Sequence, residues 1–290
     1  MDDLEKAGSF AGLSLARPAI MGIVNVTPDS FSDGGDRLDP GVAIAAGLEQ
    51  RAAGADLVDV GGESTRPNAD PVSPDEEQRR VLPVIRGLAD QGVAVSIDTR
   101  HAATMAAALD AGASLVNDVT ALTGDRAALA LVAERRAPVV LMHMRGDPLT
   151  MQQDPQYRDV VAEVADYLRA RAEACREAGV RREDICLDPG IGFGKTQAHN
   201  LALLAGTERL AALGYPLLIG VSRKSFIGRL AGGAAPKERG PGSLAAGLAA
   251  LQRGAAILRV HDVAETRQAL AVWQAIAKAD TAREGEQVHG

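Results

Sequence analysis

One pattern repeats along this chain: a short apolar run, a polar tip, and then a segment with helical spacing. A glycine suited to ending the preceding helix stands before six of the runs: Gly54, Gly92, Gly112, Gly179, Gly214 and Gly254. The eight runs are residues 19–24, 57–60, 93–97, 115–116, 138–141, 185–187, 217–221 and 256–258. Buried parallel strands read as continuous apolar runs. Eight such units predict an α/β protein whose strands close into a (β/α)8 barrel, the TIM barrel.

An open, doubly wound sheet is the alternative fold. Ligands gather at one switch point of such a sheet, so it would not place a polar tip after every strand. The barrel is therefore favoured. No linker interrupts the eight units, so we expect one domain over residues 17–280, a loosely held N-terminal arm at residues 1–16, and a flexible polar tail at residues 281–290.

The composition agrees with this fold and limits the partners. Hydrophobic residues make up 46% of the 290 residues and aromatic residues only 3%, so small aliphatic side chains must build the core. The net charge of −7 argues against a nucleic-acid or anionic membrane surface.

Cys175 and Cys186 form neither a disulfide framework nor a metal-binding pair, and we expect buried, idle thiols. The acidic N-terminus and the lack of a long apolar run predict a cytoplasmic protein without a membrane span.

The stretch from Ile185 to Lys195 is the most distinctive loop. Its apolar run ends at Asp188, and Pro189 with three alternating glycines then forms a tight turn whose backbone N–H groups can face a ligand. A nucleotide P-loop is excluded, because Pro189 stands where that motif needs a glycine. A dinucleotide fingerprint is also excluded, because only Phe193 separates the second and third glycines.

In a barrel of this kind, the polar tips meet at one mouth. They are Asn25, Thr65, Arg66, Asp98, Asn117, Met142, His143, Asp188, Lys224, Arg259 and His261. The acceptors Asp98, Asn117 and Asp188 suit a flat heterocycle that presents several N–H donors. The cationic side chains suit phosphate oxygens. A ligand with an amino-heterocycle at one end and a phosphate at the other would match both groups.

Each of these residues also has a structural interpretation. A single acceptor such as Asp98 could cap a strand end, and Lys224 could be a solvated loop residue. His143 is left out of the site as a candidate core histidine. No histidine pair has the spacing of zinc ligands. A Mg²⁺ ion held by substrate phosphates and one neutral oxygen, such as that of Asn25, would be ordinary.

The tips, in this order, resemble the motifs of the dihydropteroate synthase family over a region from about Pro18 to Ile276. The motifs that carry the resemblance are residues 22–35 (Gly-Ile-Val-Asn-Val-Thr-Pro-Asp-Ser-Phe-Ser-Asp-Gly-Gly), 63–67 (Glu-Ser-Thr-Arg-Pro), 188–195 (Asp-Pro-Gly-Ile-Gly-Phe-Gly-Lys), 222–228 (Ser-Arg-Lys-Ser-Phe-Ile-Gly) and 259–261 (Arg-Val-His). The resemblance implies a transferase of folate biosynthesis that condenses 4-aminobenzoate with 6-hydroxymethyl-7,8-dihydropterin diphosphate and releases diphosphate. One departure is Asn68, where the family usually has glycine.

The resemblance also implies a role for each tip. The expected pterin-binding residues are Asp98, Asn117, Met142, Asp188, Phe193 and Lys224. The expected diphosphate-binding residues are Asn25, Thr65, Arg66, Arg259 and His261, with Asn25 also meeting Mg²⁺. The expected aminobenzoate-binding residues are Phe31, Thr65, Pro67 and Ser225. Asp33 would sit near the reacting carbon, so the catalytic set is Asn25, Asp33, Arg66, Lys224, Arg259 and His261.

The arylamine is already neutral at working pH, so the hard step is the loss of diphosphate, and we expect a dissociative, SN1-like substitution. Two other functions stay open. A pterin-binding methyltransferase module would explain Asp98, Asn117 and Asp188, but not the loops at Asn25 and Thr65 or the residues around Lys224. A paralogue that binds ligand without turnover would also keep the motifs. Family members are commonly homodimers, so a homodimer is expected, and sulfonamides should compete with 4-aminobenzoate.

Overall fold

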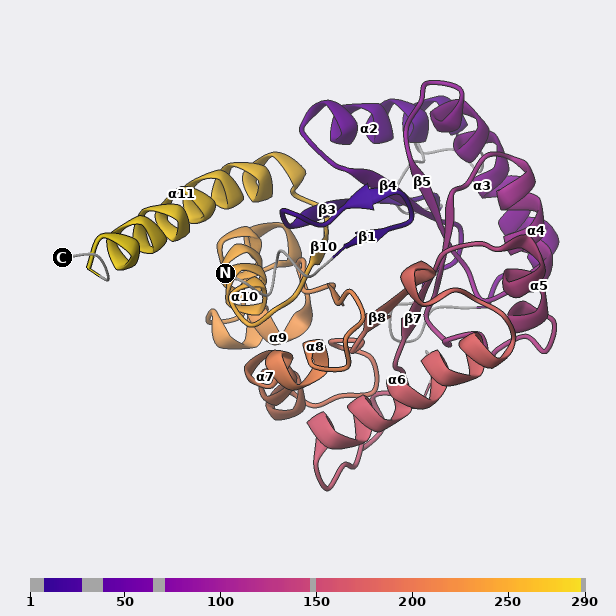
Figure 1. The fold of residues 1–290 in the computed structure, drawn as a ribbon. Coiled ribbons are helices and arrows are strands. Elements are labelled where there is room, and N and C mark those ends of the chain that lie inside the picture. The colour runs from indigo at the N-terminus through magenta and orange to yellow at the C-terminus, as the bar shows by residue number, and fades with distance from the viewer. Residues whose placement is uncertain (1–7, 28–38, 65–70, 147–149, 288–290) are drawn as a thin grey trace.

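The computed structural model of the chain describes residues 8–27, 39–64, 71–146 and 150–279, and the backbone of residues 280–287. Eight parallel strands form one sheet in the order β8-β7-β6-β5-β4-β3-β10-β9. A parallel bridge between Leu187 and Leu217 joins the two ends of this order and closes the sheet. The predicted (β/α)8 barrel is therefore confirmed, and helices surround it (Figure 1).

Every predicted apolar run overlaps one barrel strand. The strands are β3 (Ala19–Asn25), β4 (Leu57–Gly61), β5 (Val95–Asp98), β6 (Leu115–Asp118), β7 (Val139–Met142), β8 (Ile185–Asp188), β9 (Leu218–Ile219) and β10 (Ile257–Val260). The α-helices are α2 (Pro40–Ala52), α3 (Pro74–Ala89), α4 (Ala102–Asp110), α5 (Ala128–Arg135), α6 (Val160–Glu177), α7 (Gln197–Ala205), α8 (Thr207–Ala211), α9 (Ser225–Leu230), α10 (Gly240–Leu251) and α11 (Val263–Gln287). Two 3-10 turns are η1 (Arg182–Asp184) and η2 (Pro236–Glu238).

Local sequence signals set several helix boundaries. Asp39 caps α2 by accepting a hydrogen bond from the Gly41 N–H at 2.8 Å, and Pro40 follows it at the first helical position. Ser73 caps α3 in the same way, through the Glu76 N–H. All six glycines predicted to end helices have positive φ, a conformation that favours glycine. These boundaries were readable from the sequence.

The start of α6 differs from the sequence prediction. In the sequence, Asp154-Pro155 matches the pattern of an Asp cap followed by a proline at the first helical position, and so predicts the start of the longest helix. In the structure α6 begins at Val160, and α11 is the longer helix, with 25 residues against 18. Asp154 itself has φ of 53° and hydrogen-bonds to the Gln156 side chain. The cap is Asp159, whose carboxylate accepts a hydrogen bond from the Ala162 N–H at 2.9 Å. The prediction was wrong because the segment contains a second Asp cap five residues later.

The N-terminal segment closes the bottom of the barrel. Within the expected N-terminal arm, residues 8–16 contain a two-stranded hairpin, β1 (Ser9–Phe10) and β2 (Leu13–Ser14). Phe10 and Leu15 are fully buried, in one cluster with inward residues from the start of the strands such as Met21 and Leu57. Burial of these apolar side chains stabilises the hairpin against the barrel.

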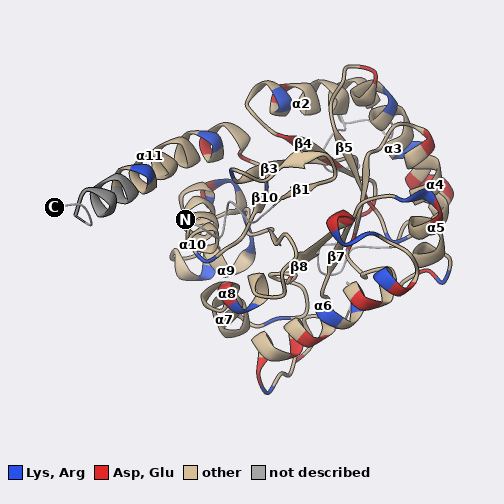
Figure 2. Ribbon diagram, viewed as in Figure 1, with Lys and Arg blue, Asp and Glu red and all other residues tan. Residues whose placement is uncertain are grey.

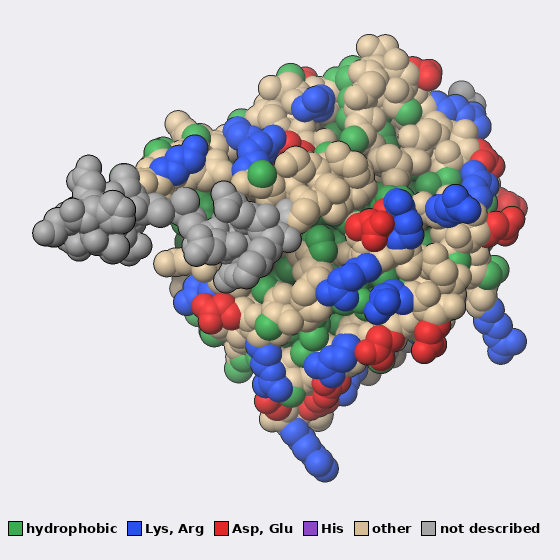
Figure 3. Space-filling model, in the orientation of Figure 1, with side chains coloured by type: hydrophobic (Ala, Val, Ile, Leu, Met, Phe, Trp, Pro, Cys, Tyr) green, Lys and Arg blue, Asp and Glu red, His purple; other side chains and the backbone are tan. Residues whose placement is uncertain are grey.

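A second, larger apolar cluster lies between the outside of the barrel and the helices. Val, Ile, Leu and Ala side chains make up most of it, as the low aromatic content predicted. Charged residues lie mainly on the surrounding helices and loops (Figure 2). On the face shown in Figure 3, acidic and basic side chains lie beside one another, with hydrophobic areas between them.

Two smaller findings concern the cysteines and the membrane. Cys175 and Cys186 are free and buried, as expected. Burial raises the pKa of the Cys175 thiol to about 11 and that of the Cys186 thiol well above its usual value, so neither is a reactive thiolate. Within the described residues, no helix combines the length and the apolar character needed to span a membrane.

Candidate active site

The polar ends of the strands meet at one end of the barrel. Asp98 lies opposite Asn117 on the neighbouring strand, and Met142 lies opposite Asp188. Residues in register on adjacent strands project from the same side of a sheet, which here is the barrel interior. Arg259 reaches this group from β10, because its guanidinium contacts Asp98. Residues that are far apart in the sequence therefore share one mouth, as the barrel predicts.

Arg259 is held between two carboxylates. Its Nη2 lies 2.7 Å from Asp98 Oδ2, and its Nε lies 2.6 Å from Asp59 Oδ2. The same Asp59 oxygen accepts a hydrogen bond from Asn117 Nδ2 at 3.0 Å. The exposed fraction of the side chain is 21% for Arg259, 13% for Asp98 and zero for Asp59. This network joins β4, β5, β6 and β10.

The glycine-rich loop after β8 packs tightly against the tip of β7. Gly190 N donates a hydrogen bond to Asp188 Oδ1 at 2.7 Å. A Cβ at Gly190 would lie 1.9 Å from the His143 carbonyl oxygen, and its φ is 65°. Only glycine fits there. The turn brings the Phe193 ring to the side of the mouth.

Lys224 lies against this loop. Its Nζ lies 4.6 Å from the centre of the Phe193 ring and donates a hydrogen bond to the Ile191 carbonyl oxygen. Such a cation–π contact orients both groups. Lys224 and Phe193 therefore form one wall of the mouth.

Burial dominates the electrostatics of these groups. It raises the pKa of Asp98 to about 8, although Arg259 opposes the rise. Burial also raises the pKa of Asp188 and lowers that of Lys224 to about 8, with the Asp188 carboxylate opposing the change in Lys224. The pKa of Arg259 is raised because Asp59 and Asp98 outweigh its own burial, so Arg259 stays a permanent cation. Perturbed groups gathered in one cleft are typical of a functional site.

The tips of β9 and β10 form the other side. His261 Nδ1 lies 3.0 Å from Ser222 Oγ, which also accepts the His261 N–H at 3.1 Å. Next to this pair, Arg223 forms an ion pair with Asp262, with Nε 3.1 Å from Oδ2. Ser225 is the first residue of α9 and is exposed.

Some predicted site residues lie outside the described part of the chain. They are Phe31, Asp33, Thr65, Arg66 and Pro67, together with Asn68. Asn25, Asp98, Asn117, Met142, Asp188, Phe193, Lys224, Ser225, Arg259 and His261 are described. Direct contacts join Asp98 and Asn117 to the Arg259 network, and Lys224 to Phe193.

Two polar residues of this region were not predicted from the sequence. Asp59 lies in a run that is otherwise apolar, and a carboxylate inside such a run is itself a signal. Lys195 is 3% exposed, and its Nζ lies 2.9 Å from both His143 Nδ1 and the Phe193 carbonyl oxygen. Burial and the Lys195 charge lower the pKa of His143 to about 3, so His143 is a neutral acceptor. His143 is buried and hydrogen-bonded, as expected of a core histidine.

A Mg²⁺ site at the mouth would need oxygen donors at the rim. Asn25 ends β3 at the rim, is half-buried, and offers one neutral oxygen. Mg²⁺ commonly keeps several waters and takes one or two protein oxygens beside substrate phosphates, so this donor fits. A group formed by Glu63, Glu77 and His101 fits less well. Both Glu63 carboxylate oxygens accept hydrogen bonds from Arg100, at 2.9 and 3.1 Å.

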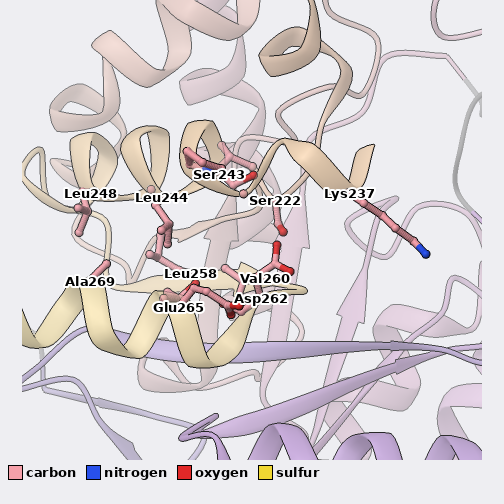
Figure 4. Close-up of a pocket in the computed structure, with 15 residues that line it drawn as sticks. Ser222, Lys237, Ser243, Leu244, Leu248, Leu258, Val260, Asp262, Glu265 and Ala269 are labelled. Atoms are coloured by element: carbon pink, nitrogen blue, oxygen red, sulfur yellow. The ribbon is translucent and has the colours of Figure 1, made fainter. Parts of the chain in front are cut away.

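A separate cavity of about 290 Å³ lies between α10, α11 and β10. Its apolar wall includes Leu244, Leu248 and Leu258, and Ser222 and Asp262 lie at the end away from Leu248 (Figure 4). It lies behind the tips of β9 and β10 and is not the mouth itself, since Asp98 and Asp188 do not line it.

The sequence of the chain matches known proteins over most of its length. The family model described as "Pterin binding enzyme" matches residues 21–261. The dihydropteroate synthase of Neisseria meningitidis serogroup C is 51% identical over 274 residues, which cover 93% of this chain and 96% of that protein. The chain belongs to the dihydropteroate synthase family.

Solved structures of dihydropteroate synthases from Xanthomonas albilineans have the same fold. One, with 4-aminobenzoic acid, is 52% identical with a TM-score of 0.87, covering 91% of this chain and 95% of that one. Another, in complex with 7,8-dihydropteroate, is 50% identical with a TM-score of 0.84 and the same coverage. This chain is therefore an enzyme of the transferase class.

Proposed function

We propose that this chain is a dihydropteroate synthase that condenses 6-hydroxymethyl-7,8-dihydropterin diphosphate with 4-aminobenzoate, giving 7,8-dihydropteroate and diphosphate. The observation that carries the proposal is the arrangement in one mouth of the acceptors Asp98, Asn117 and Asp188 beside the cations Lys224 and Arg259. The two Xanthomonas albilineans dihydropteroate synthase structures described above contain 4-aminobenzoic acid and 7,8-dihydropteroate.

The pterin would lie deepest in the mouth. Its N–H groups need acceptors, and Asp188 and Asn117, which are 6% and 4% exposed, would provide them away from water. Lys224 would donate to the acceptor atoms of the ring, with Met142 and Phe193 beside the ring faces. A buried site that pairs each polar edge of the ring rejects ligands that lack those groups.

The diphosphate would lie at the rim, near Asn25, Arg259 and His261. Arg259 stays protonated, so its charge can stabilise the leaving group throughout the reaction. When bound beside Asn25 and the phosphate oxygens, Mg²⁺ would add further positive charge there. Thr65 and Arg66 are proposed for the same part of the substrate, and Phe31, Thr65, Pro67 and Ser225 for 4-aminobenzoate, with Asp33 near the reacting carbon.

We propose a dissociative, SN1-like course. The arylamine needs no strong base, and none of the described tips is placed as one. The residues of this chain would instead orient the ring, hold the leaving group and exclude water from the developing cation. Scrambling of an oxygen isotope within the diphosphate of unreacted substrate tests this course, and its absence during turnover would contradict it.

Release of diphosphate by the purified protein tests the function directly. We expect release only when both substrates and Mg²⁺ are present, and its loss in Lys224→Ala. A sulfonamide should inhibit competitively with 4-aminobenzoate, because it imitates the shape of that substrate. Full activity at saturating sulfonamide would contradict the proposed aminobenzoate pocket.

The same assay separates the two alternatives. A methyltransferase module would bind a folate and release no diphosphate. A paralogue without turnover would bind the pterin diphosphate, with loss of binding in Lys224→Ala, and would also release none. The Asn25 and Ser225 positions favour the synthase, since a methyl transfer from a folate needs no diphosphate or aminobenzoate site.

We propose that the enzyme is a homodimer that uses α11. Val272 and Ile276 are 58% and 59% exposed and lie four residues apart, so they share one face of this helix. Exposed large aliphatic side chains on one helix face fit a helix–helix contact. Light scattering of the protein and of a Val272→Ser, Ile276→Ser variant tests this, and an unchanged mass would exclude that contact.

A further inference from the structure

A buried carboxylate inside the barrel has no role in the function proposed above. Asp59 lies in the middle of β4 and is fully buried. Its Oδ1 has no hydrogen-bond partner among the described residues. Burying an ionised carboxylate is costly, and a buried ion pair is often no more stabilising than well-packed apolar residues of similar volume. Stability of the fold therefore does not explain Asp59.

The contacts of Asp59 lead to the proposed substrate residues. Its Oδ2 receives Arg259 Nε at 2.6 Å and Asn117 Nδ2 at 3.0 Å. Arg259 uses a different nitrogen, Nη2, for Asp98 at 2.7 Å. Asp59 thus touches one residue proposed for the diphosphate and one proposed for the pterin.

Removing the Asp59 charge would change how Arg259 is shared. Arg259 would then have Asp98 as its only carboxylate partner among the described residues. The guanidinium would be drawn fully onto Asp98, the acceptor proposed for the pterin, and would lose the fixed orientation that two carboxylates impose. The amide of Asn117 would also lose the acceptor that orients it.

We propose that Asp59 is a positioning residue that holds Arg259 and Asn117, so that Asp98 and Asn117 remain available to the pterin. This inference rests on the proposed function of the mouth. It assigns Asp59 no contact with substrate. Its effect is exerted through the two side chains that it orients.

Asp59→Asn tests the inference, because it removes the charge and keeps the volume. We expect the KM for pterin diphosphate to rise about tenfold and kcat to fall by a similar factor, as for the loss of a coupled charged contact. The KM for 4-aminobenzoate should stay within about twofold, since Asp59 acts on the other substrate. A purely structural role would reduce active protein without separating the two KM values.

Ser96→Ala is the matched control. Ser96 lies opposite Asp59 on β5, is fully buried, and its hydroxyl has no partner among the described residues. Its removal perturbs the same layer of the barrel but leaves Arg259 in place. We expect unchanged kinetics, and a loss equal to that of Asp59→Asn would overturn the inference.

A double-mutant cycle tests the route through Arg259. In an Arg259→Met background, Asp59→Asn should cost about threefold or less in pterin diphosphate affinity, against about tenfold in the wild-type background. Equal costs in both backgrounds would overturn the inference. If Asp59→Asn alone does not fold, the Arg259→Met variant is compared with the double variant, in which both charges are removed together. A further tenfold loss of affinity in the double variant would overturn the inference.

The affinity for pterin diphosphate is measured by calorimetry without 4-aminobenzoate. This measurement of affinity does not depend on turnover. If the wild-type protein binds this ligand but releases no diphosphate, the proposed function fails, while the double-mutant cycle still decides the role of Asp59. Unchanged affinity in Asp59→Asn, with turnover intact, would overturn the inference alone.

Discussion

Lys224 Nζ lies 4.6 Å from the centre of the Phe193 ring, so a cation from the tip of β9 covers an aromatic ring from the glycine-rich loop after β8. Both residues were predicted for the pterin site from the sequence. Their contact gives the mouth a wall that is cationic at its edge and apolar on its face.

The protonation of Lys224 should set the alkaline limit of activity. Burial lowers the Lys224 pKa to about 8, so its charge is lost as the pH rises through that value. We expect kcat/KM for pterin diphosphate to fall about tenfold per pH unit above this point. Lys224→Arg keeps its charge at these pH values and should abolish the fall, at lower activity. An identical alkaline limb in Lys224→Arg would assign the titration to another group.

Asp98→Asn should stabilise the fold while weakening pterin binding. The folded protein holds the Asp98 proton up to a pKa of about 8, whereas an unfolded aspartate has a pKa of 3.8. The stability that this proton provides is fully present below pH 4 and is lost as the pH rises towards 8. The variant avoids this loss, so its advantage should grow with pH, by about 3 kcal/mol between pH 5 and pH 7.5. Urea unfolding at pH 5 and 7.5 measures it, and a constant difference would contradict the assignment.

Lys195→Met should displace the Phe193 loop. The Lys195 ammonium holds His143 Nδ1 and the Phe193 carbonyl oxygen, and both acceptors would lose their partner. We expect a stability loss of about 1–3 kcal/mol and about a tenfold rise in KM for pterin diphosphate. Lys237→Met, at an exposed lysine of η2, is the matched control and should change neither quantity. An unchanged KM in Lys195→Met would mean that the loop keeps its place without Lys195.

Removal of divalent cations tests the role of Asn25. Chelation should lower kcat/KM for pterin diphosphate by about 100-fold, and added Mg²⁺ should restore it. Asn25→Ala should raise the Mg²⁺ concentration needed for half-maximal rate by about tenfold, because one protein oxygen is lost. Ser225→Ala, on the proposed aminobenzoate side, should leave that requirement unchanged. Full turnover after exhaustive chelation would exclude a metal-assisted step.

The sequence predicted the barrel and the polar strand tips that meet at its mouth, because both follow from local patterns. Apolar runs, helix-ending glycines and caps such as Asp39 each act within a few residues. The mouth then follows from closure of the barrel. Asp59 escaped prediction for the opposite reason: its partner Arg259 lies 200 positions away, and only the closed barrel brings them together.

One local prediction failed for a physical reason of its own. The Asp154-Pro155 pair predicts the start of α6, because Asp-Pro is a good helix start. Asp159 is a competing cap, and α6 begins after it. The N-terminal hairpin is a different case, because so short a segment carries no periodic signal. Its stability comes from two apolar side chains that fill the open end of a barrel formed by the rest of the chain.

The N-terminal hairpin should therefore contribute to global stability. Phe10 is fully buried among inward residues of the barrel, and Phe10→Ala removes its ring from that cluster. We expect a loss of about 3–5 kcal/mol in the free energy of unfolding, as for other buried phenylalanines. Leu230→Ala, at a side chain that is 56% exposed, should cost less than about 0.5 kcal/mol. Substrate KM values should be unchanged in the folded Phe10 variant, because the hairpin and the mouth lie at opposite ends of the barrel. A loss no larger than that of the Leu230 control would mean that the hairpin detaches from the barrel in solution.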